Sequence, residues 1–308
     1  MFSKKAFQFL TAATITLVAT AGSLSLAGFL NKDYLNNPLL FSQLIGKKSS
    51  NGLNGSTSVK AQDIALNTKK EAIPKEFQGQ TIYEAKLPIK DKVIALTFDD
   101  GPGPKNTTQV LEILKKNHIK ATFFLVGEMV SFHPQIVKQI ADEGHVLGNH
   151  TWHHWYRRMD VATAASEINR TADIIYKLTG VKTTLFRPPG GFLHNGLVDY
   201  AKSQKYAIMM WSDESGDSQR RGVATTLIKN VEKSVKPGGI VLMHDGGGNR
   251  SRTVKALPQI IADLTAKGYK FVTIPELLAM QTQAKDVVTA GSSIVTKDEH
   301  PNHQLHNQ

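Results

Sequence analysis

The sequence contains no cysteine among its 308 residues. Disulfide bonds and thiolate metal sites are therefore excluded, and any metal ion must be held by histidine and carboxylate side chains. Acidic residues are scarce as well, since 26 Asp and Glu stand against 37 Lys and Arg and leave a net charge of +11. Such a charge favours anionic surroundings, for example a polyanionic cell envelope or a membrane surface. Because the chain lacks a basic block interleaved with aromatic residues, we expect no nucleic-acid partner.

The first 30 residues differ in composition from the rest. Lys4 and Lys5 precede an apolar stretch without charge, residues 6–30, and Ala19-Thr20-Ala21 offers a small-residue cleavage pattern. A buried helix does not fit, because Ser, Thr and Gly interrupt the stretch without amphipathic spacing. The segment 1–30 therefore predicts export, either through a cleaved signal peptide or with a membrane anchor retained at 6–30.

Polar segments flank the region between residues 76 and 285. Residues 31–75 are rich in Asn, Ser, Gly and Lys, which predicts a flexible linker. The tail, 286–308, is also polar and carries His300, His303 and His306 at every third position. A metal-collecting tail and a solvated, disordered terminus both fit, and the composition favours the second. With 41 % hydrophobic residues, the chain can form one enzyme-sized core, which we assign to 76–285.

Short apolar runs alternate with helical patterns in this central region. Strands are predicted at 93–98, 121–126, 145–148, 184–186, 207–211, 240–243 and 270–274. Helices are predicted at 107–116, 134–143, 162–178, 222–235 and 253–266. This alternation predicts an α/β fold with a parallel sheet covered by helices. In such folds the functional side chains gather at the carboxyl ends of the strands.

Two adjacent carboxylates, Asp99 and Asp100, stand where the apolar run 93–98 ends. On an extended backbone neighbouring side chains point to opposite sides, so we expect the two acids to have different roles. One metal ligand and one general base would fit that geometry. A plain strand-to-loop turn also fits Asp-Asp-Gly-Pro, because Asp, Gly and Pro all favour turns.

The second polar block contains His150 and His154, four positions apart. On a helical turn the two side chains would face the same way. With Asp100 they would form a set of two histidines and one carboxylate with open coordination positions, as a catalytic zinc requires. For either histidine alone, a hydrogen-bonded surface or core position is the commoner role.

Four blocks in order carry a family resemblance. They are Thr97-Phe98-Asp99-Asp100-Gly101, His150-Thr151-Trp152-His153-His154, Phe186-Arg187-Pro188-Pro189-Gly190-Gly191 and Leu242-Met243-His244-Asp245. The chain resembles the polysaccharide deacetylases of the NodB-homology type, carbohydrate esterase family 4, over roughly residues 75–285. The resemblance implies an irregular (β/α) barrel of seven or eight strands. It also implies that Asp100, His150 and His154 bind one divalent metal ion, with His153 outside the pattern.

The resemblance further implies that Asp99 is the catalytic base and that Arg187 orients it. The backbone N–H of Gly190 is expected to contribute to the oxyanion hole, with Pro189 and Trp211 on the substrate side of the same site. Many members of the family carry an aromatic residue where this chain has Gly190. Because Gly190 and Ser218 both stand where larger rings are common in the family, we expect a sugar site that is more open than is usual.

His244 matches the general acid of the family, although its position after an apolar strand also fits a core histidine. The fourth family motif, D-x-x-D-W, is the weakest match, because Glu214 and Asp217 occupy the acid positions and Ser218 replaces the tryptophan. We expect Asp217 to hold and tune His244. Asp213 and Glu214 remain alternatives for this role.

The function implied by the resemblance is hydrolysis of N-acetyl groups on N-acetylglucosamine units of a cell-wall polysaccharide. The export signal and the basic charge favour peptidoglycan over chitin, with chitooligosaccharides as further substrates. Zinc is the expected metal, with cobalt or another divalent ion as alternatives. The protein would act outside the cell, in the wall or anchored to the membrane. Two other functions also fit, a wall-binding protein without turnover and an esterase for O-acetyl groups.

Overall fold

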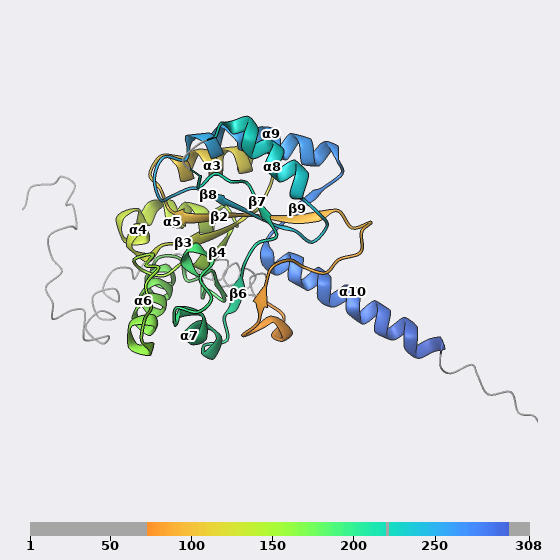
Figure 1. The fold of residues 1–308 in the computed structure, drawn as a ribbon, viewed down its shortest axis with the longest axis horizontal. Coiled ribbons are helices and arrows are strands. Elements are labelled where there is room, and N and C mark those ends of the chain that lie inside the picture. Colours follow the sequence, from red (N-terminus) through yellow and green to blue (C-terminus); the bar gives the residue numbers. More distant parts are fainter. Residues whose placement is uncertain (1–72, 220–221, 296–308) are drawn as a thin grey trace, which may run out of the picture. The chain divides into compact units, whose positions relative to one another are not determined.

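The structure, a computed structural model, describes residues 73–219 and 222–295 (Figure 1). The predicted export segment at 1–30, the linker up to residue 72 and the histidines of the C-terminal tail lie outside these residues. Within the described ranges, no helix has the length and apolar character needed to span a membrane. Ile73 is buried, so the folded domain begins before the predicted boundary at residue 76.

A parallel sheet of nine strands forms the centre of the domain, in the order β1-β6-β5-β4-β3-β2-β8-β7, with β9 pairing with β2 off this path. The strands are β1 (Thr81–Ile82), β2 (Val93–Gly101), β3 (Thr122–Leu125), β4 (Val146–Asn149), β5 (Leu185–Phe186), β6 (Ala207–Met209), β7 (Asp213–Glu214), β8 (Ile240–His244) and β9 (Lys270–Val272). All seven predicted strands are present. The sequence does not predict β1 and β7, because neither segment carries a run of apolar residues. These two strands end the path, so the described barrel is irregular and open.

Helices cover both faces of the sheet. They are α3 (Asn106–Lys116), α4 (Gly127–Phe132), α5 (Pro134–Asp142), α6 (Val161–Thr179), α7 (Leu197–Ser203), α8 (Ala224–Ser234), α9 (Ser251–Ala266) and α10 (Ile274–Val295), with the 3₁₀ turns η2 (Lys75–Phe77) and η3 (Pro189–Gly191). All five predicted helices are present. α4 and α7 are too short for their periodicity to be recognised.

The C-terminal boundary differs from the prediction. α10 runs to Val295, whereas the sequence analysis places the start of a disordered tail at residue 286. The helix begins at Ile274 with Pro275 in its first turn, where proline costs no hydrogen bond. Leu277 and Leu278 then anchor it in the core. The polar composition that predicts disorder therefore belongs in part to a helix whose first turns are buried.

The central strand β2 is buried on both faces, which explains its uninterrupted apolar run. Ile94, Leu96 and Phe98 pack into the larger core with residues of α3, α8 and α9. These three helices lie together over one face of the sheet (Figure 1). Val93 and Ala95 face the other core, which includes the start of α10. The sheet therefore holds the carboxyl end of β2 at the centre of the domain.

We predict that the aromatic contact behind β2 stabilises the fold. Phe123 is fully buried and stacks on Phe98, with 5.1 Å between ring centroids. Phe123→Ala should lower the free energy of unfolding by about 3–5 kcal/mol through lost burial and cavity formation. Phe132→Ala, at a side chain that is 65 % exposed, is the matched control and should cost less than about 0.5 kcal/mol. Equal losses for both variants in denaturant unfolding would contradict the position assigned to Phe123.

Candidate active site

The carboxyl ends of the strands surround a cleft of about 560 Å³. Seven of the predicted site residues line it: Asp99, Asp100, His150, His154, Gly190, Trp211 and His244. Arg187 and Asp217 are buried behind it. Pro189, predicted on the substrate side, is buried and does not line the cleft, where Pro188 lies instead. The ring at position 189 packs inward because the chain turns there into η3.

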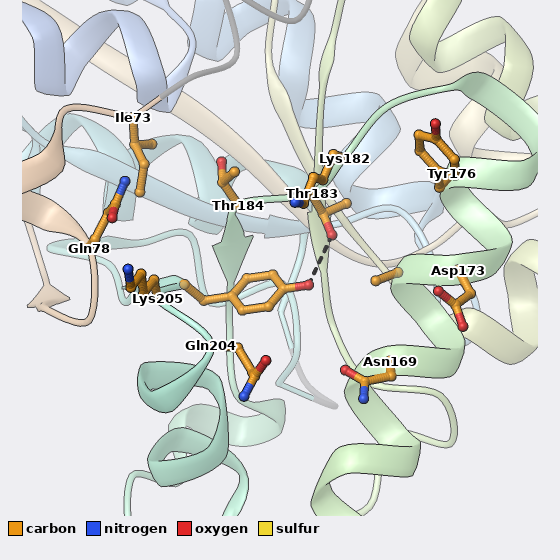
Figure 2. A pocket seen from close by; sticks show the side chains of 12 residues that line it. Ile73, Gln78, Asn169, Asp173, Tyr176, Lys182, Thr183, Thr184, Gln204 and Lys205 are labelled. Carbon is orange, nitrogen blue, oxygen red and sulfur yellow. Dashed lines mark hydrogen bonds between the residues drawn. The ribbon is translucent and has the colours of Figure 1, made fainter.

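A larger pocket of about 670 Å³ lies away from this cleft. Thr183, Thr184 and Tyr206 line it, at the amino ends of β5 and β6. Figure 2 shows its polar rim and the hydrogen bond of 3.3 Å between Thr183 and the hydroxyl of Tyr206. None of the predicted site residues contributes to it. The larger volume of this pocket therefore does not make it the candidate functional site.

The paired carboxylates do not point to opposite sides as expected. The pairing of β2 with β3 shifts register between Asp99 and Gly101, and Asp100 has φ of 71°. This bulge turns both acids toward His150, whose Nε2 lies 3.8 Å from Asp99 Oδ2 and 3.4 Å from Asp100 Oδ1. The two side chains share one cleft, and their other contacts distinguish them.

Asp100, His150 and His154 form the one candidate metal site found in the described residues. Their ligand atoms lie within 4.8 Å of one another, and Asp100 Oδ1 is 3.0 Å from His154 Nε2. Asp100 Oδ1 is buried and has no hydrogen-bond partner among the described residues. His150 Nδ1 donates to the carbonyl of Arg187 at 2.7 Å, which leaves Nε2 with its lone pair toward Asp100. These features fit a divalent metal ion with two imidazole ligands and one carboxylate ligand.

The electrostatics of Asp100 agree with this fit. Burial alone would raise the pKa of its carboxyl group. The close approach of the His150 and His154 imidazoles, 3.4 and 3.0 Å from Oδ1, outweighs burial and holds that pKa below its usual range. The side chain is therefore ready to serve as an anionic ligand.

The two histidines are not on a helical turn. Residues 150–154 form a loop after β4, in which Thr151 and His154 have φ of 67° and 59°. Asn149 Oδ1 accepts from the N–H of Thr151 at 3.0 Å, and Thr151 Oγ1 accepts from the N–H of His154 at 3.1 Å. A tight loop thus brings the histidines together, with ring centroids 4.9 Å apart.

Glu167 of α6 holds the outer side of this loop, and the sequence analysis misses it. Its Oε2 accepts from the N–H groups of Trp152 and His153 at 3.1 and 2.8 Å. Its Oε1 lies 2.5 Å from His153 Nδ1, so His153 pairs with Glu167 outside the metal set. The helical spacing does indicate a buried position for Glu167, because it lies on the same buried face of α6 as Ala164.

Arg187 is fully buried and fixes Asp99. Its Nη1 donates to Asp99 Oδ1 at 2.7 Å and to Thr97 Oγ1 at 2.8 Å. Its Nε and Nη2 donate to the carbonyls of Met209 and Met210. One oxygen of Asp99 is thereby engaged, while the carboxylate still borders the cleft.

Asp217, and neither Asp213 nor Glu214, lies against His244. Asp217 Oδ1 is 2.7 Å from His244 Nδ1, and Oδ2 accepts from the His244 N–H at 2.8 Å and from Thr253 Oγ1 at 2.7 Å. Burial alone would lower the pKa of His244, but the hydrogen bond and charge of Asp217 outweigh it, and that pKa is raised. Glu214 is exposed, and Asp213 accepts from Ser212.

Arg250 is a further polar residue of the cleft that the sequence analysis misses. Its Nη2 lies 3.4 Å from Asp100 Oδ2, its Nη1 donates to the carbonyl of Asp217 at 3.2 Å and its Nε donates to that of Gly246 at 2.6 Å. It therefore connects the backbone beside His244 with the candidate metal ligand. An arginine just before a predicted helix gives no sequence signal for such a role.

The expectation of an open sugar site at Gly190 is wrong. Gly190 has φ of 62°, and a Cβ atom there would lie 2.9 Å from Phe192 Cε2 and 2.9 Å from Tyr156 Cε1. The rings of Tyr156 and Phe192 fill the space that a larger side chain at position 190 would take. Replacing Gly190 would thus strain the backbone as well as displace these rings.

Comparisons with known proteins agree with this geometry. The polysaccharide deacetylase family model matches residues 86–209. The chain is 39 % identical over 211 residues to a peptidoglycan-N-acetylglucosamine deacetylase of Bacillus cereus, which covers 66 % of this chain and 96 % of that protein. The crystal structure of the Bc1960 peptidoglycan N-acetylglucosamine deacetylase has a TM-score of 0.61 at 35 % identity, over 66 % of this chain and 94 % of that one.

A second solved structure is a CE4 family pseudoenzyme from Bacillus anthracis. It has a TM-score of 0.60 at 31 % identity and covers 66 % of this chain and 70 % of that one. Fold, motifs and relatives agree with one another. The chain belongs to the polysaccharide deacetylase family, carbohydrate esterase family 4.

Proposed function

We propose that the protein is a metal-dependent hydrolase that removes acetyl groups from N-acetylglucosamine units of peptidoglycan. One observation carries the proposal. Three candidate ligands, Asp100, His150 and His154, share a cleft with the Asp99–Arg187 pair and the Asp217–His244 pair. The Bacillus cereus deacetylase and the Bc1960 deacetylase, both named for peptidoglycan N-acetylglucosamine, support the choice of substrate.

The metal site would be formed by Asp100, His150 and His154. A divalent ion bound there supplies Lewis acidity, which polarises the acetyl carbonyl and lowers the pKa of a bound water. Two imidazoles and a carboxylate suit zinc, which we expect as the natural metal, and other divalent ions such as cobalt accept similar ligands.

The residues on either side of this site would move the protons. Asp99, whose Oδ1 is held by Arg187, accepts a proton from the attacking water. The backbone N–H of Gly190 donates to the oxyanion that forms as water adds to the carbonyl. His244, whose protonated form Asp217 stabilises, gives its proton to the leaving nitrogen. The C–N bond breaks, and acetate and a free amine leave.

The place of action follows from the substrate. Peptidoglycan lies outside the membrane, so we propose export through residues 1–30, with signal cleavage and membrane anchoring as the two alternatives. The net charge of +11 supports association with an anionic envelope. Residues 76–285, extended by the buried start at Ile73, would form the catalytic domain.

Two other functions would use the same cleft. A wall-binding protein without turnover has a precedent in the pseudoenzyme relative. An O-acetyl esterase would use the same water chemistry on an ester. Acetate release from N-acetylated and O-acetylated substrates, compared at equal concentration, separates all three.

We predict that acetate release from purified peptidoglycan depends on a divalent metal. A chelator should reduce the rate to background, and added zinc should restore it, because the candidate metal site of the described residues lies in this cleft. Chitooligosaccharides are the parallel substrate. If no metal supports acetate release from peptidoglycan, the proposed function is wrong.

The second prediction separates the paired acids. Asp99→Asn keeps the shape of the side chain but removes the proton acceptor, so turnover should fall by about 100-fold or more with the metal still bound. Asp100→Asn should weaken metal binding, because an amide oxygen is a poorer ligand than a carboxylate. Turnover against zinc concentration measures both. Rescue of Asp99→Asn by excess zinc would show that the two roles are reversed.

The third prediction concerns pH. Asp217 raises the pKa of His244, so the acid form persists to higher pH than in an ordinary histidine. Asp217→Asn removes that charge, and the alkaline limb of kcat/KM should move to lower pH, with turnover reduced by up to about 100-fold. Thr253→Val removes one hydrogen bond to Asp217 but leaves its charge, and should shift the limb less. An unmoved alkaline limb in Asp217→Asn would exclude His244 as the acid.

A further inference from the structure

Two exposed aromatic rings meet beside the candidate cleft. Tyr156 follows the loop that carries His154, and Phe192 follows η3. Their side chains are 54 % and 50 % exposed, and their ring centroids lie 5.6 Å apart in an edge-to-face arrangement. Tyr156 lines the cleft, and Phe192 lies directly beyond it. We call this pair the aromatic platform.

The platform differs from the other exposed aromatic side chains. Tyr83, Phe132 and Tyr176 are also exposed, but none of them stacks on another ring of the described residues. Single exposed apolar side chains are common on protein surfaces and need no explanation. Two rings that are held together at the edge of a cleft form a continuous apolar surface. Such a surface points to a ligand, because exposing it to water alone brings no benefit.

The platform is held from two directions. Tyr156 also packs edge-to-face on His154, with centroids 5.1 Å apart. Gly190 lies beneath both rings, because a Cβ atom there would come within 2.9 Å of each. A glycine with φ of 62° is thus required where the rings converge. Rigid placement lowers the entropy lost on binding.

The chemistry of the platform fits a sugar ring. Axial C–H groups of a pyranose carry a slight positive charge and pack on the negative face of an aromatic ring. A ligand of this class needs an apolar surface for one face and polar groups at its edge, as in most small-molecule sites. The cleft adjoining the platform supplies such groups in Glu128 and Glu214.

We propose that Tyr156 and Phe192 bind the sugar that adjoins the N-acetylglucosamine unit undergoing deacetylation. This inference rests on the proposed function and deepens it, since it makes the enzyme selective for chains over single sugars. The platform acts by binding alone and takes no part in proton transfer.

The test uses the full-length protein with Tyr156→Ala, Phe192→Ala and the double variant. Chitotetraose and N-acetylglucosamine are the two substrates, and zinc affinity is measured first because Tyr156 touches His154. Each substitution should lower kcat/KM for the tetramer by roughly tenfold and lower that for the single sugar by a smaller factor. Tyr156→Phe and Phe192→Tyr keep the rings and should behave like the wild type. Tyr176→Ala, which removes an exposed tyrosine from the pocket of Figure 2, is the matched control.

The outcomes separate this proposal from the proposed function. If the wild type releases acetate and the alanine variants process the tetramer equally well, the platform is wrong and the function stands. If the wild type releases no acetate, the function fails, and binding of chitotetraose decides on the platform. Weaker binding by Phe192→Ala than by Tyr176→Ala supports it in that case, and equal binding overturns it. A tenfold loss of zinc affinity in Phe192→Ala would also overturn it, because binding of the sugar would then not be its role.

Discussion

The buried guanidinium of Arg187 is the constraint around which the site is assembled. Its side chain reaches β2 through Thr97 and Asp99 and the chain after β6 through Met210, while its carbonyl accepts from His150. The charge also stacks on the ring of Phe124, 4.1 Å from its centroid. Burying such a charge is costly unless every donor finds a partner, so the partners must stay in place. The ion pair with Asp99 therefore contributes geometry more than stability, and the same residue orients the candidate base and one metal ligand.

Asp100 differs from Asp99 because the backbone of the loop after β8 approaches it closely. Asp100 adopts a left-handed conformation that only a few residue types tolerate. The loop after β8 lies against it, since a Cβ atom at Gly247 would be 2.4 Å from Asp100 Oδ2 and one at Gly246 would overlap its carbonyl. Glycines at these positions are thus required for the loop to close over the acid, and Arg250 then reaches Asp100 Oδ2 from the same loop. Two adjacent carboxylates acquire separate environments because the backbone kinks between them.

Periodicity predicts seven of the nine described strands and five of the helices, because each buries a regular apolar pattern. The polar blocks that follow the strands also predict which segments border the site. Periodicity fails where contacts between residues distant in sequence determine the local structure. The loop of His150 and His154 resembles a helical turn in spacing, yet its N–H groups donate to Asn149 and Glu167 and fold it otherwise. The platform is a similar case, since nothing in the sequence around Gly190 indicates that Tyr156 lies over it.

The charges behind Asp99 and His244, the two groups proposed to transfer protons, are opposite in sign. A cation, Arg187, stands behind Asp99, and an anion, Asp217, stands behind His244. Arg187 fixes one oxygen of Asp99 at 2.7 Å, and Asp217 raises the pKa of His244 and so stabilises its imidazolium form. The cleft thus places a carboxylate and an imidazole with opposite partners beside one candidate metal site. A protein that only bound the wall would gain nothing from either pair, because each buries charge at a desolvation cost and neither presents new surface to a polymer. The two buried pairs are therefore the physical reason for favouring turnover over binding alone in this chain.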